Sequence, residues 1–447
     1  MNTKYTPIIG LEIHVELKTQ SKMFCGCSAS HFQVEPNTHT CPVCLGLPGA
    51  LPVANQKAIE WCQLIGLALN CRLAKESKFD RKNYFYPDLA KSYQISQYDQ
   101  PLCYQGEVVL KNGHKIGITR VHMEEDTGKS IHKKINGEDQ TLIDFNRSGV
   151  PLVEIVTEPD FRNPEDVDEF LKTLRQIIRY LDVSDADMEK GSMRLELNMS
   201  LTSHPELISG SHPQFPNYKV EVKNINSFKY LQKALVYEFA RQAEILDRGE
   251  TPVQETRGYQ EDVDKTISQR SKEDAQDYRY FPEPDIPPMV FEEKDLENLK
   301  KLLPELPQQK REKFTKTFGI STETAWVLTE SKELALYFEQ AVKLGEVLKI
   351  EAATIANVIK NKKYDWQKLS PEELITKLKQ ESSDKVSDEG ALGKIIDEIL
   401  KNNPKVVEDY KAGKVQVLGF LVGQVMRQTQ GKADAEISNK VLRQKLK

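Results

Sequence analysis

The segment Gly10–Leu17, GLEIHVEL, alternates apolar and polar side chains along its whole length. A period of two is typical of a β-strand with one buried face and one polar face. The apolar side chains share one face and are Leu11, Ile13, Val15 and Leu17. Glu12, His14 and Glu16 therefore share the other face. Two carboxylates and an imidazole on one strand face could be solvated, or they could form part of a site.

Four further segments alternate in the same way and are predicted strands: TRVHMEED (119–126), GVPLVEIVTEPD (149–160), MRLELNMSL (193–201) and YKVEVKN (218–224). Their polar positions hold Arg120, His122 and Glu124; Glu154 and Glu158; Arg194, Glu196, Asn198 and Ser200; Lys219, Glu221 and Lys223. One polar strand face is ordinary in an antiparallel sheet. Five such faces favour a site, because carboxylates and imidazole bind Mg²⁺ and cationic side chains bind phosphate. The pattern predicts an antiparallel sheet with a phosphoryl-transfer site on its polar face.

No phosphate-binding loop offers an alternative location for that chemistry. The fragment EEDTGKS (124–130) ends like a Walker A loop, but Met123 occupies the position of the first glycine of that motif. No GxGxxG fingerprint is found in the sequence. Three cysteines, Cys62, Cys71 and Cys103, lie in apolar or loop contexts without a nucleophile signature, and we expect them to be buried.

Four of the seven cysteines lie close together in the sequence, with the spacing C-x-C-x13-C-x2-C. They are Cys25, Cys27, Cys41 and Cys44. Two close pairs separated by a loop predict a tetrahedral structural Zn²⁺ site, in which four thiolates leave no open position for catalysis. Pairing for redox chemistry is the alternative. His31 and His39 lie inside the loop and are surplus to the four ligands.

Composition and charge limit the class of protein. The 447 residues suggest about three domains, and the 39% hydrophobic content is enough for a sizeable core. No apolar run is long enough to cross a membrane and the N-terminus lacks a secretory pattern, so we expect a cytoplasmic protein with reduced cysteines. The net charge is −5, yet residues 409–447 contain eight basic and three acidic residues. This tail predicts a polyanionic partner, with a solvated helix end as the alternative.

The order of patterns predicts an α+β protein with three parts. Residues 1–291 mix strands and helices and include the cysteine loop 25–44; one helix follows Asn163 and another follows Ser227. The segment DYRYFPEPDIPPM (277–289) has four prolines and breaks regular structure. We predict an all-α domain over residues 292–385 and a small α-helical tail over residues 386–447.

Eight motifs together make the family recognisable. They are GLEIHVEL (10–17), FDRKNYFYPDLAKSYQISQYDQP (79–101), HMEEDTGKS (122–130), DFNRSGVPLVEIVTEPD (144–160), VEVKNINSF (220–228), QETR (254–257), DYRYFPEPDIPP (277–288) and LGFLVGQVM (418–426). In this order they closely resemble the B subunit family of bacterial aspartyl/glutamyl-tRNA amidotransferases.

The resemblance implies a catalytic domain similar to glutamine synthetase, with helical domains that bind the body of a mischarged tRNA. It also implies two partners, an amidase (the A subunit) that releases ammonia from glutamine and a small third protein (the C subunit). ATP and Mg²⁺ would phosphorylate the side-chain carboxylate of Glu-tRNA(Gln) or Asp-tRNA(Asn), and ammonia would then displace the phosphate. Binding of tRNA would depend largely on RNA shape.

The matching motifs assign roles to individual residues. Glu12, His14, Glu125 and Glu154 match the family's Mg²⁺ site, whereas strand alternation places Glu124 on the face of Arg120. Lys82 and Lys91 match lysines near the ammonia route. By parity, Arg194, Glu196 and Lys223 are expected to contact the cofactor.

The chain departs from the family pattern in two places. Arg194-Leu195-Glu196-Leu197-Asn198 stands where the family usually has RCDAN, so a carboxylate is kept one methylene longer. The chain is also shorter between Ser370 and Ser387, which predicts a smaller or differently linked tail. Two other functions are compatible with these features: a tRNA-binding scaffold with a degenerate site, and a free-standing ligase for a small amino acid.

Overall fold

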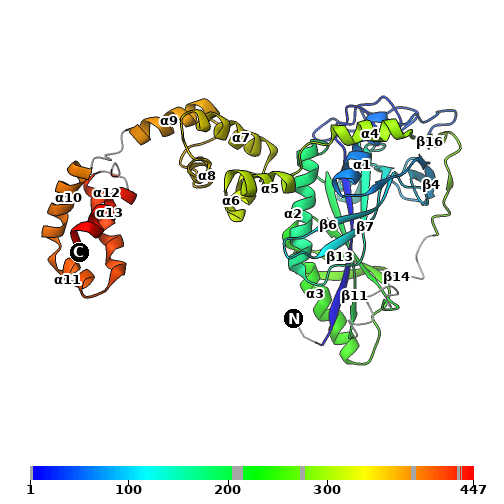
Figure 1. Ribbon diagram of the computed structural model, residues 1–447. Helices are drawn as coiled ribbons and strands as arrows, with labels where there is room; N and C mark the ends of the chain where they lie inside the picture. The colour runs from blue at the N-terminus through cyan, green and yellow to red at the C-terminus, as the bar shows by residue number, and fades with distance from the viewer. Residues whose placement is uncertain are drawn as a thin grey trace. The chain divides into compact units, whose positions relative to one another are not determined.

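The structure, a computed structural model, describes residues 4–203, 215–271, 277–383, 389–429, 433 and 435–446 (Figure 1). The chain forms two compact units, Met1–Gln309 and Lys310–Lys447. Among the described residues, no helix is both long enough and apolar enough to cross a membrane. The division into residues 1–291, 292–385 and 386–447 stays a prediction.

A nine-stranded sheet forms the centre of the first unit. In spatial order its strands are β14 (Lys265–Ser271), β13 (Glu255–Gln260), β12 (Val220–Ile225), β11 (Met193–Thr202), β1 (Thr6–Glu16), β10 (Pro151–Thr157), β7 (Lys115–Glu125), β6 (Cys103–Val109) and β2 (Arg72–Leu73). Among the described strands of this sheet, only β12 and β13 pair in parallel, so the sheet is mostly antiparallel as predicted. The segment GLEIHVEL lies in the central strand, where Ile13 and Val15 are completely buried.

Three small sheets add to the large one. Their strands are β15 (Phe281–Pro282), β4 (Asp80–Asn83) and β5 (Tyr93–Ser96); β16 (Met289–Val290) and β3 (Glu76–Ser77); β8 (Lys129–Ile135) and β9 (Glu138–Asp144). Strand β5 contacts β7 of the large sheet. The FDRKNYFYPDLAKSYQISQYDQP motif is thereby brought to the edge of the polar sheet face.

Helices cover the apolar side of the large sheet (Figure 1). The helices of this unit are α1 (Gln56–Ala68), α2 (Pro164–Leu181), α3 (Phe228–Asp247) and α4 (Glu293–Leu302). Helix α1 packs on β6 and β7, α3 packs on β11, β12 and β14, and α2 packs between α1 and α3. The helices predicted to follow Asn163 and Ser227 are confirmed, and both residues cap them: Asn163 accepts a hydrogen bond from the Asp166 amide, and Ser227 accepts one from the Tyr230 amide.

The second unit is helical. Its helices are α5 (Pro307–Phe318, which begins in the first unit), α6 (Thr322–Leu328), α7 (Lys332–Val347), α8 (Ala352–Lys360), α9 (Pro371–Ser383), α10 (Glu389–Asn402), α11 (Pro404–Lys411), the 3₁₀ helix η3 (Val415–Val417), α12 (Leu418–Gln428) and α13 (Ala435–Leu446). Helix α7 contacts α8 and α9, while α10, α12 and α13 pack around a separate apolar cluster.

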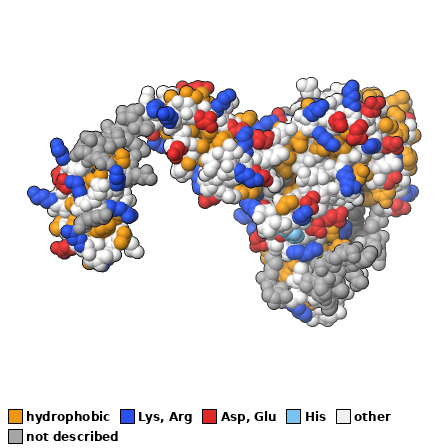
Figure 2. All heavy atoms as spheres, in the orientation of Figure 1, with side chains coloured by type: hydrophobic (Ala, Val, Ile, Leu, Met, Phe, Trp, Pro, Cys, Tyr) orange, Lys and Arg blue, Asp and Glu red, His pale blue; other side chains and the backbone are white. Residues whose placement is uncertain are grey.

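The basic tail is partly described. Six of its eight cations are exposed: Lys411, Lys414, Arg427, Lys440, Arg443 and Lys445. Lys432 and Lys447 lie outside the described residues, and so do residues 384–388, which include the predicted boundary between the all-α domain and the tail. Lys and Arg side chains project from the tail helices on the face drawn in Figure 2.

Candidate functional site

The register of three central strands brings the polar positions together. His14 of β1 lies opposite Glu154 of β10, and Glu154 lies opposite His122 of β7. On the other side of β1, strand β11 places Arg194 opposite His14 and Glu196 opposite Glu12. Directly opposite residues in antiparallel strands share a face, so these side chains form one continuous polar surface.

His14 lies at the centre of this surface. Its Nε2 atom is 3.4 Å from Glu154 Oε2, 3.8 Å from Glu124 Oε2 and 3.9 Å from Glu12 Oε1. His122 Nε2 lies 3.5 Å from Glu154 Oε2. Two overlapping sets, Glu12–His14–Glu196 and His14–Glu124–Glu154, each place three potential ligand atoms within 4.8 Å of one another. We call these residues, together with His122, the carboxylate–imidazole cluster.

Glu124 is held in this cluster by donors from the small sheet. Its carboxylate accepts hydrogen bonds from Ser96 Oγ at 2.6 Å and Gln94 Nε2 at 3.1 Å, and Lys82 Nζ lies 3.4 Å away. Burial raises the pKa of Glu124, but Lys82 and the imidazole of His122 outweigh this effect and hold the pKa well below its usual value. Glu124 is therefore an anion that the fold fixes in position.

Glu125 points to the opposite side of β7. It forms a buried ion pair with Lys91 and accepts a hydrogen bond from the Ile95 amide at 2.9 Å. The metal set expected from the family resemblance was His14, Glu125 and Glu154. The structure brings Glu124, and not Glu125, to the other two, because adjacent residues of a strand face opposite ways.

The residues expected to contact a cofactor lie along the edge of the cluster and have anionic partners. Arg194 donates to Asp126 Oδ2 at 2.7 Å. Lys223 Nζ lies 2.9 Å from Glu196 Oε2 and 3.7 Å from Glu221 Oε1. About a third of each cationic side chain remains exposed, so both Arg194 and Lys223 can still contact a bound anion.

The cluster lines a cavity of about 710 Å³. Arg120, Tyr278 and Tyr280 also line this cavity, and Arg120 lies 3.7 Å from Glu154 Oε1. A larger cavity of about 920 Å³ adjoins the cysteine loop and is lined by Phe32 and Lys129, but it contains none of the carboxylate–imidazole cluster.

The electrostatics of the cluster favour a bound cation. Burial, followed by the charges of Glu154 and Glu196, raises the pKa of Glu12 to about 8. Burial alone would raise the pKa of Glu154, but His122 and His14 lower it to about 2. Burial alone would lower the pKa of His14, but Glu154 raises it to about 9. Crowded carboxylate oxygens of this kind suit a hard divalent cation such as Mg²⁺, and the imidazole adds a nitrogen ligand.

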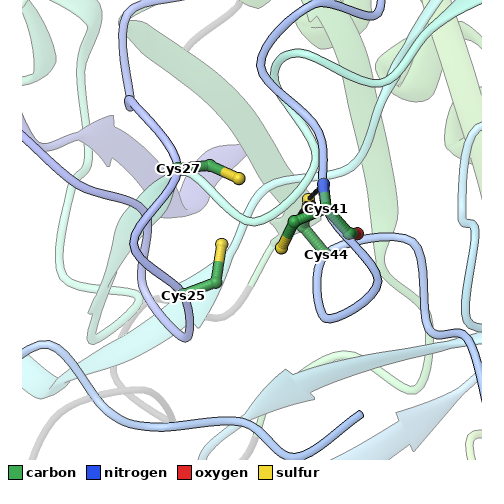
Figure 3. Close-up of side chains that lie close together, drawn as sticks. All are labelled: Cys25, Cys27, Cys41 and Cys44. Atoms are coloured by element: carbon green, nitrogen blue, oxygen red, sulfur yellow. Dashed lines mark hydrogen bonds between the residues drawn. The ribbon is translucent and has the colours of Figure 1, made fainter.

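The four clustered cysteines converge as predicted (Figure 3). Their Sγ atoms lie within 4.8 Å of one another, and those of Cys41 and Cys44 are 3.9 Å apart. Four sulfurs bound tetrahedrally at about 2.3 Å would lie about 3.8 Å apart, so the cluster fits a metal ion in a closed structural site. All seven cysteines are free, and Cys62, Cys71 and Cys103 are buried as expected.

Several polar contributors were absent from the predicted set. His122 and Arg120 could have been included, because alternation already placed them beside Glu124. Gln94 and Ser96 come from a different sheet, and the local sequence gave no sign of their contact with Glu124. Glu158 was predicted to share a face with Glu154; it follows the end of β10, is exposed, accepts a hydrogen bond from Thr119 Oγ1 at 2.7 Å and does not line the cavity.

Two protein-family models match this chain, one over its N-terminal part and one over its C-terminal part. Residues 7–297 match the family described as the GatB/GatE catalytic domain, and residues 323–446 match the GatB domain. The chain is 45% identical to the B subunit of the aspartyl/glutamyl-tRNA(Asn/Gln) amidotransferase of Caldanaerobacter subterraneus, over 99% of both chains. It is 43% identical to the proteins of the same name from Caldicellulosiruptor bescii and Thermomicrobium roseum, also over 99% of both chains. These alignments span 484 to 489 positions, more than the chain's 447 residues, and therefore open gaps in it.

Proposed function

We propose that this chain, which belongs to the GatB/GatE family, is the B subunit of a tRNA-dependent amidotransferase that converts Glu-tRNA(Gln), Asp-tRNA(Asn) or both to the amide. The observation that supports this proposal most directly is the carboxylate–imidazole cluster in a cavity of about 710 Å³. The relatives' names describe the overall reaction, and the cluster provides a place for its carboxylate-activating step.

The reaction has to convert a poor acyl donor into a good one. A carboxylate oxygen of the aminoacyl side chain attacks the γ-phosphorus of ATP, an O–P bond forms, and the bond to the β-phosphate oxygen breaks to release ADP. Ammonia nitrogen then bonds to the carbonyl carbon, the C–O bond to phosphate breaks with its electron pair, and the nitrogen loses a proton. Both substrates of the first step are anions, so the site must offset their repulsion.

The residues divide this work by charge. His14, Glu124 and Glu154 would hold Mg²⁺, with Glu12 and Glu196 beside them. When bound, Mg²⁺ supplies positive charge that offsets the phosphate oxygens. Arg120, Arg194 and Lys223 lie at the cavity wall and are half-buried, where they can orient phosphate oxygens.

The two lysines of the FDRKNYFYPDLAKSYQISQYDQP motif occupy different places. Lys82 lies at the cavity beside Glu124, and Lys91 is buried against Glu125 on the opposite face of β7. Both remain proposed contacts of the ammonia route. The partners would be an amidase (the A subunit), which supplies ammonia, and the small C subunit.

Other properties follow from the same assignment. The catalytic domain would resemble that of glutamine synthetase, and the helical domain and tail would bind tRNA. The exposed tail cations suit the phosphate backbone of RNA, although Lys414 pairs with Asp409 and Lys445 with Asp397. We assign Zn²⁺ to the four cysteines and the cytoplasm as location.

The test uses the chain assembled with these two partner proteins, in the presence of ATP, Mg²⁺ and ammonium. ADP release and amide formation are followed on Glu-tRNA(Gln), on Asp-tRNA(Asn) and on free glutamate. Amide formed together with ADP on an aminoacyl-tRNA, and none on free glutamate, is the expected result. Binding of tRNA without ADP release would instead indicate a scaffold, and amidation of free glutamate would indicate a free-standing ligase.

A further inference from the structure

Lys22 is a buried cation in an unusual environment. It precedes the cysteine loop and is completely buried. Its ammonium group donates to the His39 carbonyl at 2.7 Å and the Phe145 carbonyl at 3.3 Å, and it lies 3.6 Å from Cys44 Sγ. Within the part of the chain that the structure describes, Lys22 has no ion pair with a carboxylate.

A buried ammonium group needs a compensating anion, because an isolated charge in a protein interior is very costly. Carbonyl oxygens satisfy its N–H groups but bring no charge. Among the residues that the structure describes, its one other polar contact is the Cys44 sulfur of the four-cysteine cluster. Four thiolates around one divalent cation have a net negative charge, so a metal–thiolate centre is the countercharge that this position requires.

The same ammonium group contacts a second segment, residues 144–149, which leads into β10 and Glu154. The cysteine loop binds this segment at several further points. Asn146 Oδ1 accepts from the His39 amide at 2.7 Å, Asn146 Nδ2 donates to the Glu35 carbonyl at 2.8 Å, and Ser148 Oγ donates to the Cys44 carbonyl at 3.1 Å.

From there the contacts reach the cavity. The Gly149 amide donates to the Asp126 carbonyl at 2.9 Å, and Arg147 donates to the carbonyls of Thr127 and Gly128. Asp126 in turn binds Arg194 at the cavity wall. The metal cluster is thus connected to both β10 and the end of β7, the two strands that present Glu154 and Glu124.

We propose that Lys22 is a positioning residue, which pairs with the metal-bound Cys44 thiolate and couples the occupied cysteine cluster to residues 144–149 and the catalytic strands. Lys22 does not touch substrate. It stabilises the metal centre through Cys44 and holds the Phe145 carbonyl in register with it. Loss of the ammonium group loosens both.

The first experiment compares Lys22→Met with Lys18→Met, a nearby lysine whose side chain is about two-fifths exposed and pairs with Asp182. The rate of zinc release to a colorimetric chelator is measured on the purified chain. The kcat and KM values for ammonium-dependent amidation are measured on the assembled complex. Zinc should leave Lys22→Met about 10- to 100-fold faster, as for other partners of metal ligands. Its kcat should fall roughly tenfold or more while the KM for ATP changes little, because the catalytic strands are displaced. Lys18→Met should behave like the wild type.

Three results would overturn the proposal: no zinc in the purified wild-type chain, wild-type zinc release from Lys22→Met, or faster release with an unchanged kcat. If Lys22→Met does not fold, hydrogen exchange on the wild-type chain decides. Removing zinc should speed exchange at the Asn146, Ser148 and Gly149 amides and leave α2 protected. Unchanged exchange at those amides, or equal acceleration in α2, would refute the coupling.

The kcat measurement rests on the proposed function, whereas zinc release and hydrogen exchange do not. A wild-type complex that makes no amide would refute the proposed function. Zinc release and hydrogen exchange would still test the proposed role of Lys22.

Discussion

The substitution Glu124→Gln tests whether Glu124 belongs to the proposed metal site with His14 and Glu154. The low pKa of Glu124, caused by Lys82 and His122 against the effect of burial, means that the substitution removes a full negative charge at neutral pH. The shape of the side chain is nearly unchanged. The substitution also creates a local conflict: its amide nitrogen would face Gln94 Nε2, which already donates to the Glu125 carbonyl at 2.7 Å.

The magnitudes follow from these contacts. One lost hydrogen bond and a donor facing a donor should lower the free energy of unfolding by about 1–3 kcal/mol, which leaves a folded protein. The substitution removes the carboxylate partner of Lys82, but the negative charge of Glu154 still acts on that ammonium group. This limits the loss of stability that comes from leaving Lys82 without Glu124. Removing charge stabilisation at the reacting phosphate should lower kcat by about 10²- to 10³-fold, or about 2.7–4 kcal/mol. The Mg²⁺ concentration for half-maximal rate should rise at least about tenfold.

The assay follows ADP release and amide formation by the assembled complex over a Mg²⁺ titration. Glu158→Gln is the matched control, because it makes the same chemical change at an exposed carboxylate outside the cavity. The control should retain the wild-type kcat and Mg²⁺ dependence. A Glu124→Gln complex with wild-type kcat and an unchanged Mg²⁺ midpoint would show that Glu124 is not part of the metal site.

Three further predictions concern stability. Asn163→Ala removes the cap of α2 and should lower the denaturant midpoint by the equivalent of about 1 kcal/mol, with an unchanged slope m; a midpoint equal to the wild type's would contradict the cap. Phe170→Ala empties a completely buried position and should cost about 3–5 kcal/mol in chemical unfolding; a loss below about 1 kcal/mol would mean that this core position is not tightly packed. Burial raises the pKa of Glu339, but the ion pairs with Lys310 and Lys313 outweigh this effect, so the folded-state pKa is below the unfolded value of 4.5. The ionised carboxylate therefore stabilises the fold above the unfolded pKa, and this contribution is lost as the pH falls through the folded pKa. Glu339→Gln should therefore cost up to about 1 kcal/mol at pH 7, allowing for solvent screening, and progressively less as the pH is lowered below 4.5, as followed by tryptophan fluorescence in chemical unfolding. A cost that does not change with pH, or the same cost from Glu346→Gln on the same helix, would contradict this.

Local patterns predicted much of the fold. Alternation identified β1, β7, β10, β11 and β12, and the caps at Asn163 and Ser227 gave the starts of two helices. These signals depend on neighbours in the sequence, since a strand has a period of two and a cap acts within its first turn. Parity alone also placed Glu12, His14 and Glu124 on one face, which the strand pairing confirms.

Positions that depend on distant contacts could not be predicted in this way. Motif matching favoured Glu125, but the pleat of β7 directs it to Lys91 instead. The donors that fix Glu124 belong to β5, whose packing against β7 is a tertiary contact. The register shift between β7 and β10, at which Thr119 is skipped, has no signal in the local sequence either.

Lys22 illustrates the same limit. Its sequence context, between the end of β1 and the first cysteine, gives no reason to expect a completely buried cation. Only the folded chain brings it to Cys44 and Phe145, which lie 22 and 123 residues away in the sequence.

The most direct test of the central claim is isotope transfer from substrate to phosphate. Glu-tRNA(Gln) labelled with ¹⁸O in both oxygens of its side-chain carboxylate is amidated by the complex, and the released phosphate is analysed by mass spectrometry. If the carboxylate is phosphorylated on the polar sheet face, each phosphate released with an amide contains one ¹⁸O and the amide keeps the other. Unlabelled phosphate accompanying amide formation would contradict the account, because the carboxylate would then never have been bonded to the phosphorus of ATP.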